Sequence, residues 1–518
     1  MKNPIPASCL LPCTILLASF ALTFPATGAN QTWVATSGNT IWSDSTRWSN
    51  GTLADGDNLT FGTSGTLAAS NNDIAGLSVN NITGLGAREM DATGNGITLT
   101  GNISHSGASK RLYLQMDMEL GSGAHGLYND SNSNALSIGR NATASITGSG
   151  SIVKSGAGLV AIMGRNNTFT GGVTVNDGIL RSGNGSLTGL GDGTVFGTGA
   201  VVVNGTGILD INRGSQVEVR SISGNGTITN YASSSSISTL TVNNTSANSF
   251  SGNITDADNH TSAYLGLTKK GVGTLTLNGS ANTLRGQVLV NEGTLLINGT
   301  NVHTIASSGG GFNNASDGKY KIASGATLGG IGRIAGNNTQ SNSNLVLVEN
   351  GGLIAPGNGG IGTLTLDGDA MTGTSPVLLK MNSGSKFSFD LSGDGSSADE
   401  IHFWSYGSGK FVLNSNEINF ALTGSQVAGN YTVTLFRFYS DGGDTAMASG
   451  ISSGLTVGTL GTGINSATIV YNTNTIDLNY GVDVIPEPGT AAFLLMVGLV
   501  AVLGIRRRNH EPPRTTIV

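Results

Sequence analysis

Residues 154–180 read KSGAGLVAIMGRNNTFTGGVTVNDGIL, and residues 269–295 read KKGVGTLTLNGSANTLRGQVLVNEGTL. The two segments align without a gap, and 12 of their 27 positions are identical. Val173-Thr-Val175 in one copy and Val288-Leu-Val290 in the other alternate with the period of a β-strand, and the flanking glycines mark changes of chain direction. A unit of two or three such short strands cannot bury its own inner face. It must therefore stack on neighbouring units, as the coils of a solenoid do.

The composition of the whole chain also favours β-structure. It has 80 Gly among 518 residues, 11% charged residues and 6% aromatic residues, and Gly, Thr and Asn are weak helix formers. Short apolar runs such as Val201-Val-Val203 are interleaved with polar residues, whereas a disordered chain lacks apolar faces to bury. Similar runs follow other glycines and indicate further, degenerate coils: Gly207–Ile211, Gly224–Ile228, Gly325–Leu328, Gly332–Ile334 and Gly362–Leu366.

We therefore predict an all-β protein in which residues 30–385 form an elongated, right-handed parallel β-helix, or solenoid. Residues 386–482 are also β-rich, and form either a separate module or further coils. Stacked coils place Val, Leu and Ile inward and Thr, Asn and Ser outward. This arrangement accounts for a polar surface that carries few charges.

The N-terminal residues 1–29 have the features of an export signal. Lys2 supplies positive charge, a mostly apolar stretch follows, and small residues precede a cleavage point near Ala29. Both cysteines, Cys9 and Cys13, lie inside this segment. The exported protein is thus expected to interact with signal peptidase and to contain neither a disulfide nor a reactive thiol.

The C-terminal residues 485–508 combine three features. Pro486-Glu487-Pro488 comes first, residues 489–505 are free of charge and form a predicted apolar helix, and Arg506, Arg507 and Arg508 follow directly. At about 1.5 Å per residue this helix is barely long enough for a hydrocarbon core of about 30 Å. The arginines would hold the end of the chain on the cytoplasmic side. A plain tail anchor explains the helix and the arginines, but not the Pro-Glu-Pro triad.

Both sets of features resemble known elements. The repeated segments resemble the autotransporter-associated β-strand repeat of passenger-like, β-helical surface proteins, and Trp33, Trp42 and Trp48 resemble the N-terminal part of such proteins. The C-terminal features resemble the PEP-CTERM sorting signal. That resemblance implies recognition by an exosortase in the inner membrane of a Gram-negative bacterium, removal of the helix, and transfer to the cell surface or extracellular matrix. A polar tail, residues 509–518, extends past the usual end of such signals and leaves cleavage open.

Few residues suggest chemistry. The six histidines show no zinc-ligand spacing, so we predict no metal site and no cofactor. The formal net charge of −6 and the lack of basic clusters outside the C-terminus argue against nucleic acid as a partner. The one acidic cluster consists of four carboxylates with one histidine and one tryptophan nearby: Asp390, Asp394, Asp399, Glu400, His402 and Trp404.

Parallel β-helices can host polysaccharide lyases and glycosidases, which need a few acids in a groove. A catalytic carboxylate also needs cationic or aromatic neighbours to bind sugar and to shift its pKa, and this cluster has few. We interpret it as a solvated or ion-binding loop. The three N-terminal tryptophans could stack on sugar, but we expect them to pack as a cap over the first coil.

The sequence thus predicts an exported, non-catalytic protein of the cell surface or extracellular matrix, with a structural or adhesive role. It would pass through an inner-membrane intermediate and be sorted by an exosortase, and exopolysaccharide is a candidate partner. The alternatives are a β-helical protein that binds polysaccharide and one that degrades it. The sequence does not rank ligands.

Overall fold

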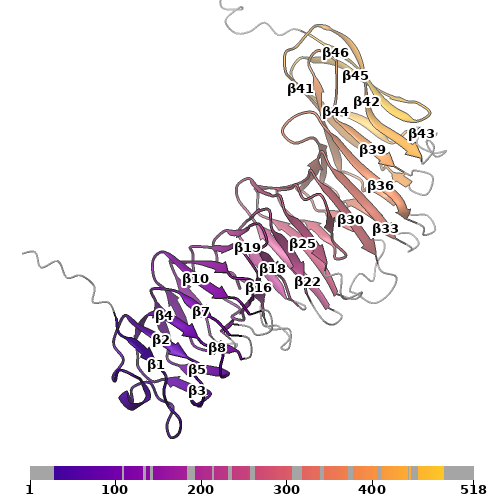
Figure 1. The fold of residues 1–518 in the computed structure, drawn as a ribbon. Helices are drawn as coiled ribbons and strands as arrows, with labels where there is room; N and C mark the ends of the chain where they lie inside the picture. The colour runs from indigo at the N-terminus through magenta and orange to yellow at the C-terminus, as the bar shows by residue number, and fades with distance from the viewer. Residues whose placement is uncertain are drawn as a thin grey trace, which may run out of the picture.

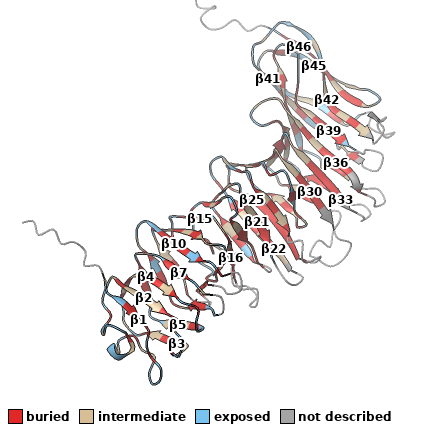
Figure 2. Cartoon of the chain, viewed as in Figure 1, coloured by how far each residue is buried: buried red, intermediate tan, exposed pale blue. Residues whose placement is uncertain are grey.

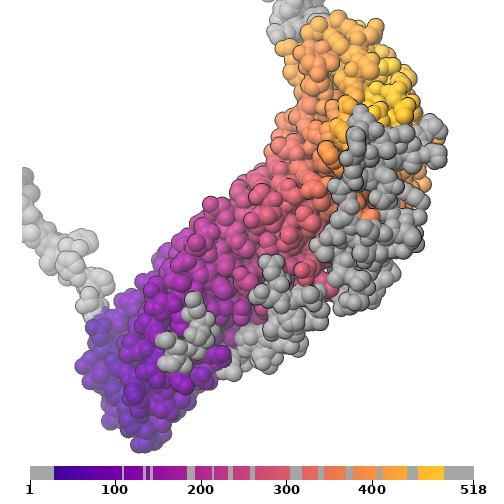
Figure 3. All heavy atoms as spheres, turned by 45° about the vertical axis from the view of Figure 1, so that its right-hand side comes forward, coloured from indigo at the N-terminus to yellow at the C-terminus, as the bar shows by residue number. Residues whose placement is uncertain are grey.

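The computed structural model describes residues 28–107, 110–131, 136–139, 144–183, 193–212, 215–231, 236–256, 263–305, 318–338, 344–371, 377–404, 410–440, 443–444 and 453–483. Within these ranges the chain is almost entirely β-strand, with one short 3-10 helix, η1 (Ser45–Arg47). The strands stack into an elongated, curved rod (Figure 1). The sequence runs in order along the rod axis, from the indigo end to the yellow end (Figure 3). The predicted all-β solenoid is confirmed, while its handedness stays a prediction.

Three sheets of mostly parallel strands run along the rod, and each coil passes from one sheet to the next. Sheet 1 extends from one end of the rod to the other. In the N-terminal part it carries two strands per coil, because the long strand β4 pairs with both β6 and β7. Its strands are β1 (Asn30–Thr32), β2 (Asp57–Phe61), β4 (Ser78–Gly84), β6 (Ile97–Leu99), β7 (Ile103–His105), β9 (Met118–Leu120), β10 (Ala124–Asn129), β12 (Ile146–Gly148), β13 (Ser151–Ser155), β15 (Val173–Val175), β17 (Val201–Val203), β20 (Ile222–Gly224), β23 (Asn248–Phe250), β26 (Thr274–Leu277), β29 (Thr294–Ile297), β32 (Thr327–Gly330), β35 (Leu353–Pro356), β38 (Lys386–Ser392), β41 (Asn416–Thr423) and β44 (Leu455–Leu460).

Sheet 2 also follows the whole rod and ends in an antiparallel arrangement. Its strands are β3 (Ala69–Asn72), β5 (Met90–Gly94), β8 (Leu112–Leu114), β11 (Leu136–Ile138), β14 (Leu159–Ile162), β16 (Ile179–Ser182), β18 (Ile208–Asp210), β21 (Thr227–Asn230), β24 (Asn253–Asp256), β27 (Asn282–Thr283), β30 (Thr300–Ile305), β33 (Arg333–Asn338), β36 (Thr363–Met371), β39 (Glu400–Trp404), β42 (Gly429–Ser440), β43 (Gly443–Asp444), β45 (Ile464–Tyr471) and β46 (Thr475–Val482).

Sheet 3 begins near the middle of the rod and ends before its last coils. Its strands are β19 (Gln216–Val219), β22 (Ser236–Asn243), β25 (Ala263–Lys270), β28 (Val288–Val290), β31 (Tyr320–Ile322), β34 (Asn344–Val348), β37 (Val377–Met381) and β40 (Lys410–Val412).

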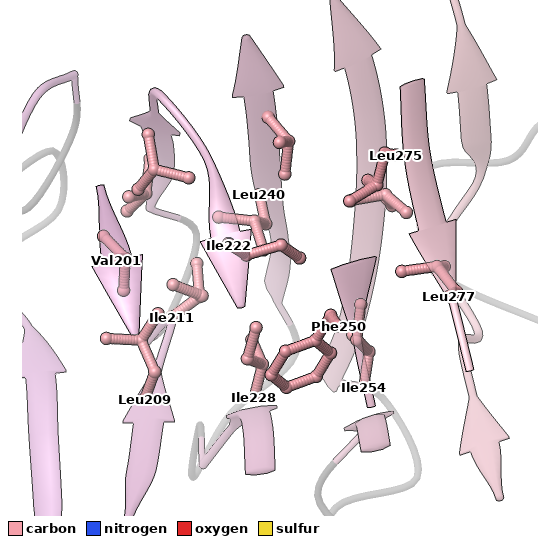
Figure 4. Close-up of a cluster of buried hydrophobic side chains, with 14 of the residues drawn as sticks. Val201, Leu209, Ile211, Ile222, Ile228, Leu240, Phe250, Ile254, Leu275 and Leu277 are labelled. Atoms are coloured by element: carbon pink, nitrogen blue, oxygen red, sulfur yellow. The ribbon is translucent and has the colours of Figure 1, made fainter. Parts of the chain in front are cut away.

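The core is a set of apolar side chains stacked along the rod. Strand residues alternate between buried and more exposed positions, as the period of two requires (Figure 2). In sheet 2, Leu209 pairs with Ile228 and Ile228 with Ile254, so each inward side chain lies on the equivalent side chain of the next coil (Figure 4). One coil therefore buries the apolar face of its neighbour, which no coil could do alone.

The N-terminal end of the rod is closed by tryptophans. Trp33, Trp42 and Trp48 are 0–3% exposed, and their rings pack edge to face beside Phe61. The segment that carries Trp48 also covers the free edge of β1, since the amide of Ser49 donates to the carbonyl of Thr32. The expected cap is confirmed, and the burial of these rings contradicts a sugar-stacking role for them.

Parallel pairing passes through residue 386 without a break. Strand β38 pairs with β35 on one side and with β41 on the other, and β41 pairs with β44. The last strands then change direction, because β46 pairs antiparallel with both β42 and β45. Of the two alternatives for residues 386–482, this continuity favours further coils, ended by an antiparallel hairpin.

Candidate functional surface

A buried lysine forms the corner of each repeat copy. Lys154 is 0% exposed, and its Nζ donates to the carbonyls of Ser155, Gly156 and Asp177 at 3.0, 2.6 and 2.9 Å. Three acceptors match the three donors of an ammonium group. Burial lowers the pKa of this lysine to about 8, so the charged form still prevails at pH 7. The lysine thus supplies a donor to three backbone carbonyls of two neighbouring coils.

The second copy builds the same corner. Lys269 is 0% exposed and donates to the carbonyls of Lys270, Gly271 and Glu292 at 2.7, 2.6 and 3.2 Å. Burial lowers its pKa to about 8 as well. The equivalent donors and acceptors show that the Lys-x-Gly-x-Gly signature encodes this corner.

A glycine faces each lysine corner from the next coil. Gly178 has φ +62°, and a Cβ there would lie 2.3 Å from the carbonyl oxygen of Gly156. Gly293 has φ +65°, and its Cβ would lie 2.4 Å from the carbonyl oxygen of Gly271. These are the carbonyls that the lysines bind, so a side chain would both strain the backbone and crowd the corner.

A buried asparagine forms the second corner of each copy. Asn167 accepts from the amide of Ile146 at 2.7 Å and donates to the carbonyl of Val195 at 2.6 Å, which joins three coils. Asn282 accepts from the amide of Ile254 and donates to Asn301, which in turn donates to the hydroxyl of Tyr320. The second copy therefore has a longer buried chain of hydrogen bonds than the first.

The acidic cluster does not form a single site. The carboxylate of Asp399 is buried and accepts from the amides of Gly362 and Asp390 at 2.7 and 2.8 Å, so it holds the backbone of two strands together. Burial raises its pKa to about 7. Asp394 lies in an exposed turn, where bonds from Ser392 and Ser396 lower its pKa to about 2. Because successive side chains along a strand point to opposite faces, Asp399 is buried in the rod while Glu400 lies on its outer face.

Glu400, His402 and Trp404 lie on the outer face of β39, while Ile401 and Phe403 point into the core. His402 Nε2 is 2.6 Å from Glu400 Oε2. Trp404 is 41% exposed, whereas the other three tryptophans are buried. Glu400, His402 and Trp404 therefore lie together as the sequence suggested. The aspartates of the predicted cluster do not lie with them.

The neighbouring strand β42 completes this surface with two residues that the sequence did not single out. Arg437 pairs with His402 across the strands, and its Nε lies 3.8 Å from Glu400 Oε2. The ring of Tyr439 stacks on that of Trp404, with centroids 4.9 Å apart and planes inclined by 24°. We call these five residues, Glu400, His402, Trp404, Arg437 and Tyr439, the aromatic face.

On the other side, β36 and β33 border the aromatic face in the same sheet (Figure 1). Asp367 pairs across the strands with Trp404, and Arg333 Nε donates to Asp367 Oδ2 at 2.7 Å. Beneath the face, Phe403 and Phe438 stack with their planes inclined by 7°. A packed aromatic core therefore supports the strands that carry the exposed polar and aromatic groups.

The remaining predicted elements lie outside the described residues or at separate places in the rod. The signal segment 1–29, apart from Gly28 and Ala29, and the sorting residues Pro486, Glu487, Pro488 and Arg506–Arg508 fall outside the described residues, as do the apolar segment 489–505 and the tail. Among the residues that are described, no helix is long and apolar enough to cross a membrane. His105, His125 and His303 are buried in the rod at separate coils. In the described ranges, no three acidic or histidine side chains gather as metal ligands.

The comparisons with known proteins agree with the repeats. Residues 152–181 and 267–297 match the family described as passenger-associated-transport-repeat. These two segments contain the two lysine corners. No curated protein matches the chain. The matches support an exported, passenger-type surface protein of a Gram-negative bacterium.

Proposed function

We propose that this chain is an exported structural or adhesive rod, displayed on the cell surface or in the extracellular matrix and without a catalytic role. The observation that carries the proposal is the pair of passenger-associated-transport-repeats, which build equivalent corners in one continuous stack of coils. A solenoid of this kind builds a long rod by stacking similar coils made from few residue types. Its core is apolar and its outer surface is rich in Ser, Thr and Asn.

Sorting by an exosortase is the second part of the proposal. It rests on the order of Pro486-Glu487-Pro488, the apolar segment 489–505 and Arg506–Arg508. In this scheme the apolar segment holds the chain in the inner membrane until cleavage near Pro488. The rod then leaves the membrane without its anchor.

The chain in its native host tests both parts. Mass spectrometry of the extracellular fraction should find a stable species that begins near residue 30 and ends near Pro488. Replacing Pro486, Glu487 and Pro488 by alanine should leave the chain in the inner membrane. A matched control replaces Pro512 and Pro513 in the tail and should be processed normally. Recovery of full-length chain alone, confined to the inner membrane, would contradict the sorting proposal.

The non-catalytic part has its own test. Asp399 uses both carboxylate oxygens to accept backbone amides, and Glu400 is bonded to His402 on the outer face, so the two carboxylates do not flank one groove. Purified protein should leave neutral and anionic polysaccharides intact. Hydrolysis or elimination that is lost in both Asp399→Asn and Glu400→Gln would establish an enzyme instead.

A further inference from the structure

The exposure of Trp404 is the starting observation. Three of the four tryptophans are 0–3% exposed and close the N-terminal end of the rod, whereas Trp404 is 41% exposed on an outer strand face. Large apolar rings are costly to leave in water, by about 25 cal/mol per Å² of apolar area. Other apolar side chains, such as Val272 and Ile331, are exposed singly, but Trp404 is the exposed tryptophan and lies against a second aromatic ring. This pair of rings points to a ligand that can cover it.

The ring is held in place. Tyr439 stacks against it with ring centroids 4.9 Å apart, and the rings of Tyr439 and His402 meet edge to face with centroids 5.2 Å apart. The strand positions between these residues are filled by Ile401, Phe403 and Phe438, all 0% exposed. The aromatic face is thus preorganised, and a ligand that stacks on it need not order it first.

The polar groups around the indole are paired with one another. Glu400 is bonded to His402 and lies near Arg437, while Arg333 binds Asp367 beside Trp404. The two arginines and the two carboxylates balance in charge. Asp367 is 3% exposed, so it neutralises Arg333 without itself facing a ligand. Glu400 lies against both His402 and Arg437. Neither an anionic nor a cationic ligand therefore gains a net attraction.

A neutral sugar fits this combination better. The C–H face of a pyranose ring is apolar and stacks on indole, while its hydroxyls can donate to the Glu400 carboxylate and accept from guanidinium groups. Hydrogen bonds to charged partners are roughly twice as strong as neutral ones.

We propose that the aromatic face, with the Arg333–Asp367 pair beside it, binds neutral polysaccharide by stacking pyranose rings on Trp404. This inference deepens the adhesive role under the proposed function and rests on it for its biological setting. The binding itself is measured on the purified protein. A failure of sorting and a failure of binding are therefore separate results.

Affinity electrophoresis and tryptophan fluorescence test the proposal on purified exported protein. The neutral probes are hydroxyethylcellulose, dextran and mannan, and the anionic probes are alginate and polygalacturonate. At least one neutral polymer should retard the protein, and Trp404→Ala should weaken that binding by at least 10-fold. Trp404→Phe, which keeps an aromatic ring, should recover most of it. Tyr128→Ala is the matched control, because Tyr128 is 42% exposed in the N-terminal part of the rod.

Iodide quenching adds a readout that a folding defect would not imitate. Since Trp404 is the one exposed tryptophan, iodide should quench its emission selectively, and the bound neutral polymer should protect it. Binding that is equal in wild type and Trp404→Ala would overturn the proposal. Retention by the anionic polymers alone, or by none of the five, would overturn it as well.

Discussion

The two repeat copies are alike in chemistry but lie on different faces of the rod. In the first copy, Lys154 and Val173–Val175 belong to sheet 1. In the second, Lys269 and Val288–Val290 belong to sheet 3. Each following strand is displaced in the same sense, because Leu159–Ile162 lies in sheet 2 and its counterpart in sheet 1. The offset of 115 residues is therefore not a whole number of coils.

The difference shows that the repeat sequence itself determines the lysine corner, whichever sheet of the rod it lies in. The lysine, its three carbonyls and the opposing glycine are supplied by the copy itself, so they need no particular sheet. The asparagine corner is less independent. Asn282 joins a chain through Asn301 to Tyr320, whereas Asn167 donates to the carbonyl of Val195. The copies should thus respond alike at their lysines and unequally at their asparagines.

Removal of both lysines should have the largest effect. Lys154→Met or Lys269→Met leaves three carbonyls without their donor, and each should lower the free energy of unfolding by about 3 kcal/mol. The corners share no partner, so the double variant should lose about 6 kcal/mol. Urea denaturation followed by circular dichroism measures this. The control is Lys321→Met, a partly exposed lysine paired with Glu349, which should change stability by less than about 0.5 kcal/mol.

If the two single lysine variants lost different free energies of unfolding, the two corners would not be equivalent. The corner would then depend on its face of the rod as well as on its sequence.

The glycines that oppose the lysines should rank next. Gly178→Ala and Gly293→Ala each place a Cβ against a backbone carbonyl at positive φ, and we expect each to cost about 2.5 kcal/mol. Gly205→Ala is the matched control, because Gly205 has φ +51° and nothing within 4 Å of its added Cβ. It should lose about 1 kcal/mol from strain alone. If all three cost the same in urea denaturation, crowding of the corner plays no part.

The asparagines should sharpen the comparison. Asn167→Ala removes two hydrogen bonds, whereas Asn282→Ala removes those to Ile254, Gly279 and Asn301, and leaves the side-chain oxygen of Asn301 without that donor. The second variant should therefore be about 1 kcal/mol less stable than the first. The same denaturation experiment measures the difference, and equal losses would show that the chain to Tyr320 is not coupled to the corner.

The smallest effect is expected at Val272, which is 77% exposed and occupies the position of Ala157 in the first copy. Val272→Ala makes the two turns identical there. A surface change of this kind should alter the free energy of unfolding by less than about 0.5 kcal/mol. A larger loss in urea denaturation would mean that the second copy uses this side chain in a contact that the first copy lacks.

Much of the fold follows from the sequence because the alternation of apolar residues is local. It predicts which residues of β15 and β28 point inward, and the clustered tryptophans predict the cap. The displacement of the copies between sheets cannot be predicted in this way. This displacement depends on the total length of the coils between the two copies, which no local sequence pattern indicates.

The candidate surface was partly predictable for the same reason. Period two separates Asp399 from Glu400, so alternation alone could have divided the acidic cluster. By contrast, Arg437 and Tyr439 reach the face through pairing between strands 35 residues apart in sequence, as between His402 and Arg437. Register at that distance is set by packing of the intervening coil, and the sequence pattern does not encode it locally.

The titration of Lys154 and Lys269 tests most directly the claim that both copies build one corner on different faces. Carbon-13 NMR of labelled lysine side chains measures each pKa, with the Lys154→Met and Lys269→Met variants assigning the signals. Both amines should titrate together near pH 8, because both are buried, and well below the usual lysine value of about 10.4. A normal pKa for either lysine would place that amine in water and contradict the shared corner.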